Sequence, residues 1–171
     1  ELNINSNLGA NPKLFDRFIS KLKPIIEEKK VKEFKLFTSI DTWDKDKAEY
    51  IRNGLDIELF KRNFDKYLTE IKDSKLSLMI TFNNLCVTNF DSLLEQILKW
   101  REKYNDKDAK ERGNINQPIP LQRIQMDTPY LKEPPHYDMN ILPKEDFTHY
   151  MINHLEYMMM YNNDDDNTKF K

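Results

Sequence analysis

The sequence predicts an α/β fold built from parallel βαβ units. Short apolar stretches alternate with amphipathic helical patterns along most of the chain. Each helical pattern separates two strand-like stretches, which is typical of right-handed crossovers between parallel strands. The 171 residues suffice for one domain with a hydrophobic core. Three glycines are too few for the fingerprint of a classical Rossmann or P-loop protein, so other doubly wound sheets and (β/α) barrels remain.

The first pair of elements is a strand over residues 2–6 and a helix over residues 11–30. Asn11 is a good N-cap, and Pro12 suits the first helical position because no backbone hydrogen bond needs its missing N–H there. Pro24 lies inside the same helical pattern. It predicts a kink or a break, since a proline there removes one helical hydrogen bond.

A second strand over residues 33–40 precedes two further helical patterns. One face of this strand carries its alternating buried set: Phe34, Leu36, Thr38 and Ile40. Residues 44–50 predict a short helical turn, and Asp56 caps a longer helix over residues 57–72. The apolar residues of that longer helix recur at helical spacing: Leu59, Phe60, Phe64, Tyr67, Leu68 and Ile71.

The pattern continues with a strand over residues 75–82 and a helix over residues 91–104. Residues 105–118 are polar and predict a loop that is long for a compact domain. Residues 119–127 predict the last strand. At least one helical pattern thus separates each pair of successive strands, as parallel βαβ units require.

The last part of the chain differs in composition. Residues 128–143 are rich in proline and predict an irregular connector, and residues 144–162 predict a final helix. The residues after this helix are mostly polar and predict a solvated tail. The domain division expected is therefore a βα unit over residues 1–130 and a connector with its helix over residues 131–171.

Composition narrows the classes of partner. The 27 basic residues nearly cancel the 29 acidic ones, so no global field favours nucleic acid or an anionic membrane. The sequence shows no signal peptide and no long apolar run, which predicts a cytoplasmic protein. Cys86 is the one cysteine, and it predicts a buried structural thiol because no basic partner lies near it in the sequence. The three histidines are scattered, so no metal site is expected.

Polar residues follow each predicted strand at its carboxyl end. They are Ser6–Asn7–Leu8–Gly9, Ser39–Ile40–Asp41, Asn83–Asn84 and Gln125–Met126–Asp127. Ligands of parallel α/β proteins bind at this edge, so four polar ends favour a ligand face there. No catalytic triad and no pair of glutamates accompanies them, so we expect binding of a polar ligand and assign no catalytic residue.

Arg52 is the one cation near these strand ends whose spacing allows it to bind a ligand carboxylate through two N–H groups of its guanidinium. A surface salt bridge with Glu49 or Asp56 explains its position equally well. Spacing alone leaves both interpretations open.

Four segments in this order resemble the radical S-adenosylmethionine (SAM) enzymes, in the branch with a C-terminal SPASM or twitch auxiliary-cluster domain. They are NSNLG at 5–9, FTSIDTW at 37–43, AEYIRNGLD at 48–56 and LSLMITFNNL at 76–85. The resemblance covers about residues 2–130 and rests most on the S-x-D strand end and the arginine of IRNG. It implies a partial (β/α)6 TIM-like barrel, of which this chain would supply strands three to six. The connector and final helix would then lead toward the auxiliary-cluster domain.

The resemblance also implies a function. Enzymes of this family cleave SAM reductively at a [4Fe–4S] cluster and abstract hydrogen from a substrate, here a peptide or a protein. Ser39 would contact SAM, and Arg52 would pair with its carboxylate. The other implied cofactor-side residues are Asn7, Asp41, Asn83 and Gln125. The family's CxxxCxxC motif is absent, so the chain is expected to be a fragment that binds no cluster and catalyses nothing alone.

Two alternatives from other classes stay open. The chain could be a non-catalytic α/β binding module that holds a polar metabolite at the strand ends. It could also be a degenerate family member that recognises a partner protein through its methionine-rich last helix, where Met158, Met159 and Met160 are adjacent.

Overall fold

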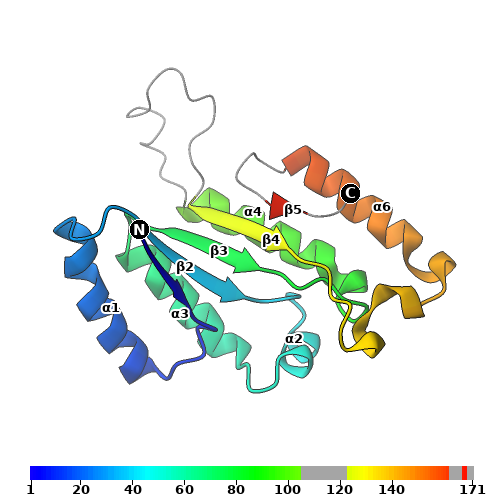
Figure 1. The fold of residues 1–171 in the computed structure, drawn as a ribbon, viewed down its shortest axis with the longest axis horizontal. Helices are drawn as coiled ribbons and strands as arrows, with labels where there is room; N and C mark the ends of the chain where they lie inside the picture. Colours follow the sequence, from blue (N-terminus) through cyan, green and yellow to red (C-terminus); the bar gives the residue numbers. More distant parts are fainter. Residues whose placement is uncertain (105–122, 162–166, 169–171) are drawn as a thin grey trace.

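The fold is a parallel β-sheet with α-helices, as the sequence predicts (Figure 1). The computed structural model describes residues 1–104, 123–161 and 167–168. Its sheet has the strand order β1-β2-β3-β4-β5, and every neighbouring pair is parallel. The strands are β1 (Leu2–Asn5), β2 (Phe34–Ser39), β3 (Lys75–Met79), β4 (Ile124–Thr128) and β5 (Asn167–Thr168).

Helices connect these strands. The α-helices are α1 (Pro12–Glu27), α2 (Lys45–Ile51), α3 (Ile57–Glu70), α4 (Phe90–Tyr104) and α6 (Lys144–Tyr161). Short 3₁₀ turns are η1 (Val87–Asn89), η2 (Pro135–Tyr137) and η3 (Met139–Ile141). Within the described residues, no helix combines the length and the apolar content that crossing a membrane requires.

Strand order follows chain order without a reversal. Right-handed crossovers between successive neighbouring strands place their helices on the same side of a sheet. Figure 1 shows α3 and α4 behind the sheet, with α1 and α6 at its two flanks. Helices therefore cover one face of the sheet, and the two faces carry different kinds of side chain.

The helix-covered face holds the core. The four residues predicted for the buried face of β2 and its extension are all at most 1% exposed: Phe34, Leu36, Thr38 and Ile40. Helices α3 and α4 add an aromatic cluster in which the Phe64 ring centroid lies 5.7 Å from Phe60 and 4.1 Å from Trp100. The Trp100 ring also meets Trp43 edge-on at 4.9 Å. Large aromatic surfaces packed this way contribute much of the hydrophobic stabilisation.

The second face is mostly polar. Along one register row, Asn5 is paired with Phe37, Phe37 with Ser77, and Ser77 with Gln125. Because side chains alternate between the faces of a strand, these four share the face opposite the core. Lys35, on the same face, donates a hydrogen bond from Nζ to Oε1 of Gln125 at 2.5 Å.

The predicted helix starts are confirmed. The side chain of Asn11 accepts the amide of Leu14, and that of Asp56 accepts the amide of Leu59. Asp44 caps α2 in the same way. Pro24 does not end α1, which continues to Glu27, because one missing N–H removes a single hydrogen bond while the buried stripe of the helix still packs.

Three expectations about the ends of elements need correction. The helix expected over residues 11–30 ends at Glu27, and the strand expected over residues 75–82 ends at Met79. The tail after α6 is not wholly solvated, because Asn167 and Thr168 pair in parallel with Asp127 and Thr128 of β4. Backbone groups on the free edge of β4 can pair with another strand whatever the polarity of its side chains. Such pairing cannot be predicted from the hydropathy of the sequence. Residues 124–127 of the strand expected over residues 119–127 lie in β4, whereas residues 119–122 and the predicted loop 105–118 lie outside the described residues.

Candidate functional site

The carboxyl ends of β2 and β3 bring two of the predicted site residues into direct contact. Chain leaving β2 carries Asp41, and helix α2 returns so that its C-cap residue Arg52 reaches back to that carboxylate. Arg52 Nη2 donates to Asp41 Oδ1 at 2.8 Å, and Arg52 Nε lies 2.8 Å from Asp41 Oδ2. The same Oδ1 accepts the amide of Thr81, just beyond β3, at 2.8 Å.

This pair settles which acidic group neutralises Arg52. Asp41 is 3% exposed, so its carboxylate depends on these three contacts in place of water. The two acids that sequence spacing suggested have other partners: Glu49 accepts the amide of Ile57, and Asp56 accepts that of Leu59. Arg52 is therefore part of a partly buried ion pair.

Burial raises the pKa of Asp41 above its ordinary value. The hydrogen bond and positive charge of Arg52 and the amide of Thr81 act in the opposite direction. Burial penalises the charged form of the Asp41 carboxylate, and Arg52 is the main group that stabilises this charged form. Asp41 thus positions Arg52, and its own oxygens are already occupied within the protein.

Arg52 itself retains capacity for a ligand. Its side chain is 30% exposed, and Nη1 makes no hydrogen bond within the described part of the chain. A guanidinium held by one carboxylate can still donate from its remaining edge to a second one.

Asn83 has a structural role at the turn after β3. Its Nδ2 donates to the carbonyl of Thr81 at 2.9 Å, and its Oδ1 accepts the amide of Leu85 at 2.9 Å. The residue is 1% exposed. Both polar ends of the side chain are therefore occupied by backbone, so it shapes the strand end without facing a ligand.

Ser39 and Asn7 lie at strand ends, as predicted. Ser39 is the last residue of β2, is half-buried, and its hydroxyl makes no hydrogen bond within the described residues. Asn7 is exposed after β1, and its Oδ1 accepts the amide of Gly9 at 2.9 Å. Ser39 is thus available at the carboxyl edge, while Asn7 stabilises its own turn.

Gln125 lies apart from this cluster. It is the second residue of β4, is paired in register with Ser77, and is 7% exposed beneath Lys35. Asp127, two residues later on the same face, is paired with Met79, which is paired with Ser39. Asp127 is therefore the β4 residue level with the tip of β2.

Asp127 is also a site residue that the sequence interpretation did not select. Its Oδ1 is buried and has no hydrogen-bond partner within the described residues. An unpartnered buried carboxylate oxygen is costly unless a ligand or water satisfies it. The sequence feature that could have identified Asp127 is its position as the last residue of the predicted strand. Gln125 lies two residues before that end.

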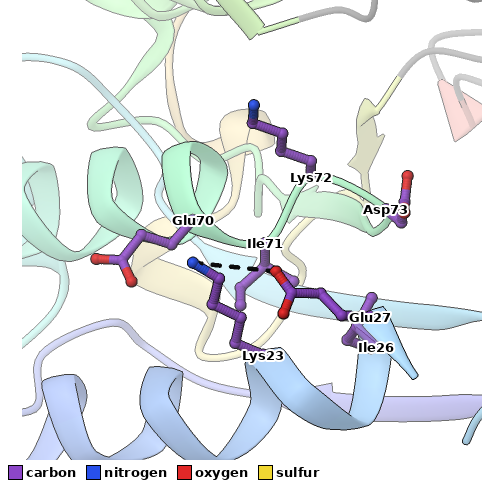
Figure 2. A pocket seen from close by; sticks show the side chains of 7 residues that line it. All are labelled: Lys23, Ile26, Glu27, Glu70, Ile71, Lys72 and Asp73. Carbon is purple, nitrogen blue, oxygen red and sulfur yellow. Dashed lines mark ion pairs between the residues drawn. The ribbon is translucent and has the colours of Figure 1, made fainter. Parts of the chain in front are cut away.

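A pocket of about 280 Å³ lies at the opposite end of the helices (Figure 2). It is lined by the last turns of α1 and by the residues that end α3. Figure 2 shows side chains of both signs around it, with Lys23 and Glu27 joined as an ion pair at 4.0 Å. Neutralised charges at helix ends match no particular ligand, so this pocket carries no functional assignment. The candidate site is the strand-end cluster, which consists of Ser39, Asp41, Arg52 and Asp127.

Cys86 is buried near the same strand end, as predicted. It is 0% exposed, and its thiol donates to the carbonyl of Asn83 at 3.2 Å. Burial raises the pKa of the Cys86 thiol to about 12. A thiol without thiolate character and without access to solvent is chemically inert.

A thiol reagent is accordingly expected to leave Cys86 unmodified in the folded protein at about pH 7.5 and to modify it fully in denaturant. Mass spectrometry after maleimide treatment with and without urea measures both states. The matched control is Leu14→Cys, at a position that is 57% exposed, which is expected to react in the folded protein. Rapid native labelling of Cys86 would contradict its structural role.

The described residues contain no group of three or more histidine, cysteine or acidic side chains that could hold a metal ion. Comparison of the chain with protein-family models, curated proteins and solved structures finds no match. The geometry of the strand ends is therefore the main guide to function.

Proposed function

We propose that residues 1–130 form the later part of a radical SAM barrel and that the strand-end cluster binds the methionine moiety of SAM. The observation that carries this proposal is Arg52, held by Asp41 with Nη1 left free, near the strand end that carries Ser39. Arg52 Nη1 would donate to the carboxylate of SAM, and the Ser39 hydroxyl and Asp127 Oδ1 would accept from its amine.

The topology supports the proposal. Successive parallel strands lie side by side in chain order, which is how strands follow one another in the wall of a (β/α) barrel. The polar second face would then face the barrel interior, which suits a site that holds a polar cofactor and a substrate. Residues 131–171 would continue toward an auxiliary-cluster domain, and the substrate would be a peptide or a protein.

The [4Fe–4S] cluster of the family does not fit the residues of this chain. Its CxxxCxxC motif has no counterpart among the 171 residues, whose one cysteine, Cys86, is buried and hydrogen-bonded to Asn83. The proposed role of this chain is therefore cofactor binding, and no redox step is assigned to its side chains.

Calorimetry with SAM tests the proposal directly. Ser39→Ala is expected to weaken SAM binding about fivefold, the effect of one lost hydrogen bond. Decarboxylated SAM, which lacks the group for Arg52, is expected to bind at least about tenfold more weakly than SAM. Arg62→Ala is the matched control, because Arg62 pairs with Asp16 on the surface. No SAM binding, or equal binding of both ligands, would refute the proposal.

The gene offers a second test. If the chain is part of a radical SAM protein, the reading frame upstream of Glu1 is expected to encode CxxxCxxC. An initiation codon directly before the codon for Glu1, with no longer product in cells, would count against a fragment.

A partner-recognition role is the second candidate, and one observation favours it. Met159 and Met160 on α6 are 75% and 72% exposed, and flexible thioether side chains are common at adaptable binding surfaces. Replacing both by glutamate is expected to abolish capture of a partner while leaving SAM binding unchanged. If the protein binds SAM and captures no partner, the partner-recognition role is refuted and the SAM-binding proposal stands.

A further inference from the structure

A groove separates α6 from the end of β4 and the chain that follows it. Its volume is about 610 Å³, within the range of small-molecule sites. The apolar part of its lining comes mainly from one side of α6: Phe147, Met151, Ile152, Leu155 and Met158. We name this feature the α6 groove.

Two buried polar groups also line the α6 groove. Thr128 and His154 are each 2% exposed. Neither Thr128 Oγ1 nor His154 Nδ1 has a hydrogen-bond partner within the described residues. A buried polar atom without a partner costs about 1–3 kcal/mol, so two in one groove are a destabilising feature unless a ligand satisfies them.

The surroundings of His154 explain why it offers a neutral hydrogen-bonding group. Its ring packs against Phe90 at 5.3 Å and Phe82 at 6.4 Å. Burial lowers the pKa of His154, and the charge of Asp91 opposes that shift. A neutral imidazole can donate or accept at Nδ1 according to its tautomer, so it adapts to the ligand group it meets.

Lys132 supplies the one charged group of the lining, which contains no carboxylate. Lys132 forms no ion pair within the described part of the chain. Its charge contributes to lowering the pKa of Asp138, which does not line the groove, so the ammonium group is available to a ligand there. A long apolar wall with a single cation complements a molecule with an apolar body and one anionic group.

We propose that the α6 groove binds a small amphipathic carboxylic acid, with its apolar body along α6 and its carboxylate at Lys132. The carboxylate is the one polar group of such a molecule, so the hydroxyl of Thr128 and the imidazole of His154 donate to its oxygens beside Lys132. This site lies on the helix side of β4, since Thr128 shares the face of the buried residues Ile124 and Met126. It is independent of the proposed SAM site and does not require it.

Binding of decanoate below its micelle concentration tests the proposal, with calorimetry or amide chemical shifts as the readout. Thr148→Trp is expected to fill the groove and weaken decanoate binding by at least about tenfold. Its matched control is His149→Trp, because His149 is also exposed on α6 but does not line the groove. That control is expected to bind decanoate like the unaltered protein.

Lys132→Ala separates the two parts of the recognition. It is expected to weaken decanoate binding about fivefold and to leave binding of the uncharged decanol unchanged. Failure of decanoate to bind, or equal loss with both tryptophan variants, would overturn the proposal. So would a dimer that Thr148→Trp dissociates, because a second copy of the chain would then occupy the groove. SAM binding measured on the same variants distinguishes failure here from failure of the proposed function.

Discussion

Phe64→Ala is expected to lower the free energy of unfolding by about 3–5 kcal/mol. Phe64 is 1% exposed and packs against Phe60 of the same helix and Trp100 of α4, with ring centroids 5.7 and 4.1 Å away. Removing its ring leaves a cavity between α3 and α4 that neither neighbour can fill without leaving its own contacts. The loss therefore combines apolar burial with the cost of that cavity.

Urea unfolding followed by circular dichroism measures this change. The matched control is Tyr50→Ala, which also removes an aromatic ring from a helix but at a position that is 72% exposed. That variant is expected to stay within about 0.5 kcal/mol of the unaltered protein. A similar loss in both variants would mean that the aromatic cluster is not the centre of the core.

Arg52→Ala is expected to cost about 2–3 kcal/mol, because it leaves the carboxylate of Asp41 buried with only the amide of Thr81. This is less than for a fully buried pair, since the Arg52 side chain is 30% exposed. Arg62→Ala removes an arginine from an exposed pair with Asp16 and is expected to cost at most about 1 kcal/mol. Adding Asp41→Asn to Arg52→Ala is expected to restore part of the stability, because it removes the unpaired charge.

The stability deficit of Arg52→Ala is also expected to shrink as the pH falls from about 7.5 to about 5. Burial already raises the pKa of Asp41, and removing Arg52 takes away the largest opposing contribution. The folded variant then binds a proton more readily than the folded unaltered protein does, so acid stabilises the variant more than it stabilises the unaltered protein. Urea unfolding at the two pH values measures the deficit, and a constant deficit would show that Asp41 titrates alike in the two folded proteins.

Much of the fold could be predicted because it depends on short-range patterns. The cap residues Asn11 and Asp56 bind amides three residues away, and the alternation in β2 is local as well. The order of strands and helices follows from the same periodicities. The pairing of Asn167 and Thr168 with β4 could not be predicted, because a short polar segment carries no hydropathic signal for an edge it joins through backbone groups.

The candidate site was predictable only as a region. Parallel strands bring their carboxyl ends to one edge, so Ser39, Asp41 and Arg52 were expected near one another. Sequence spacing did not reveal that Arg52 pairs with Asp41, because three acids lie within reach of it along the chain. From the predicted strand end Gln125–Met126–Asp127 it selected Gln125, whereas Asp127 is the residue level with Ser39, because the sequence does not show the register between neighbouring strands.

The sequence by itself determined the parallel α/β class, the helix starts, the buried face of β2 and the burial of Cys86, all of which follow from local pattern and residue type. Only the tertiary structure decided which polar groups outside the helix caps found a partner. It joined Arg52 to Asp41, and it left Asp127, Thr128 and His154 with buried atoms that have no partner within the described residues. The physical reason is that a hydrogen bond requires its two atoms within about 3 Å, and the packing of distant segments sets that distance.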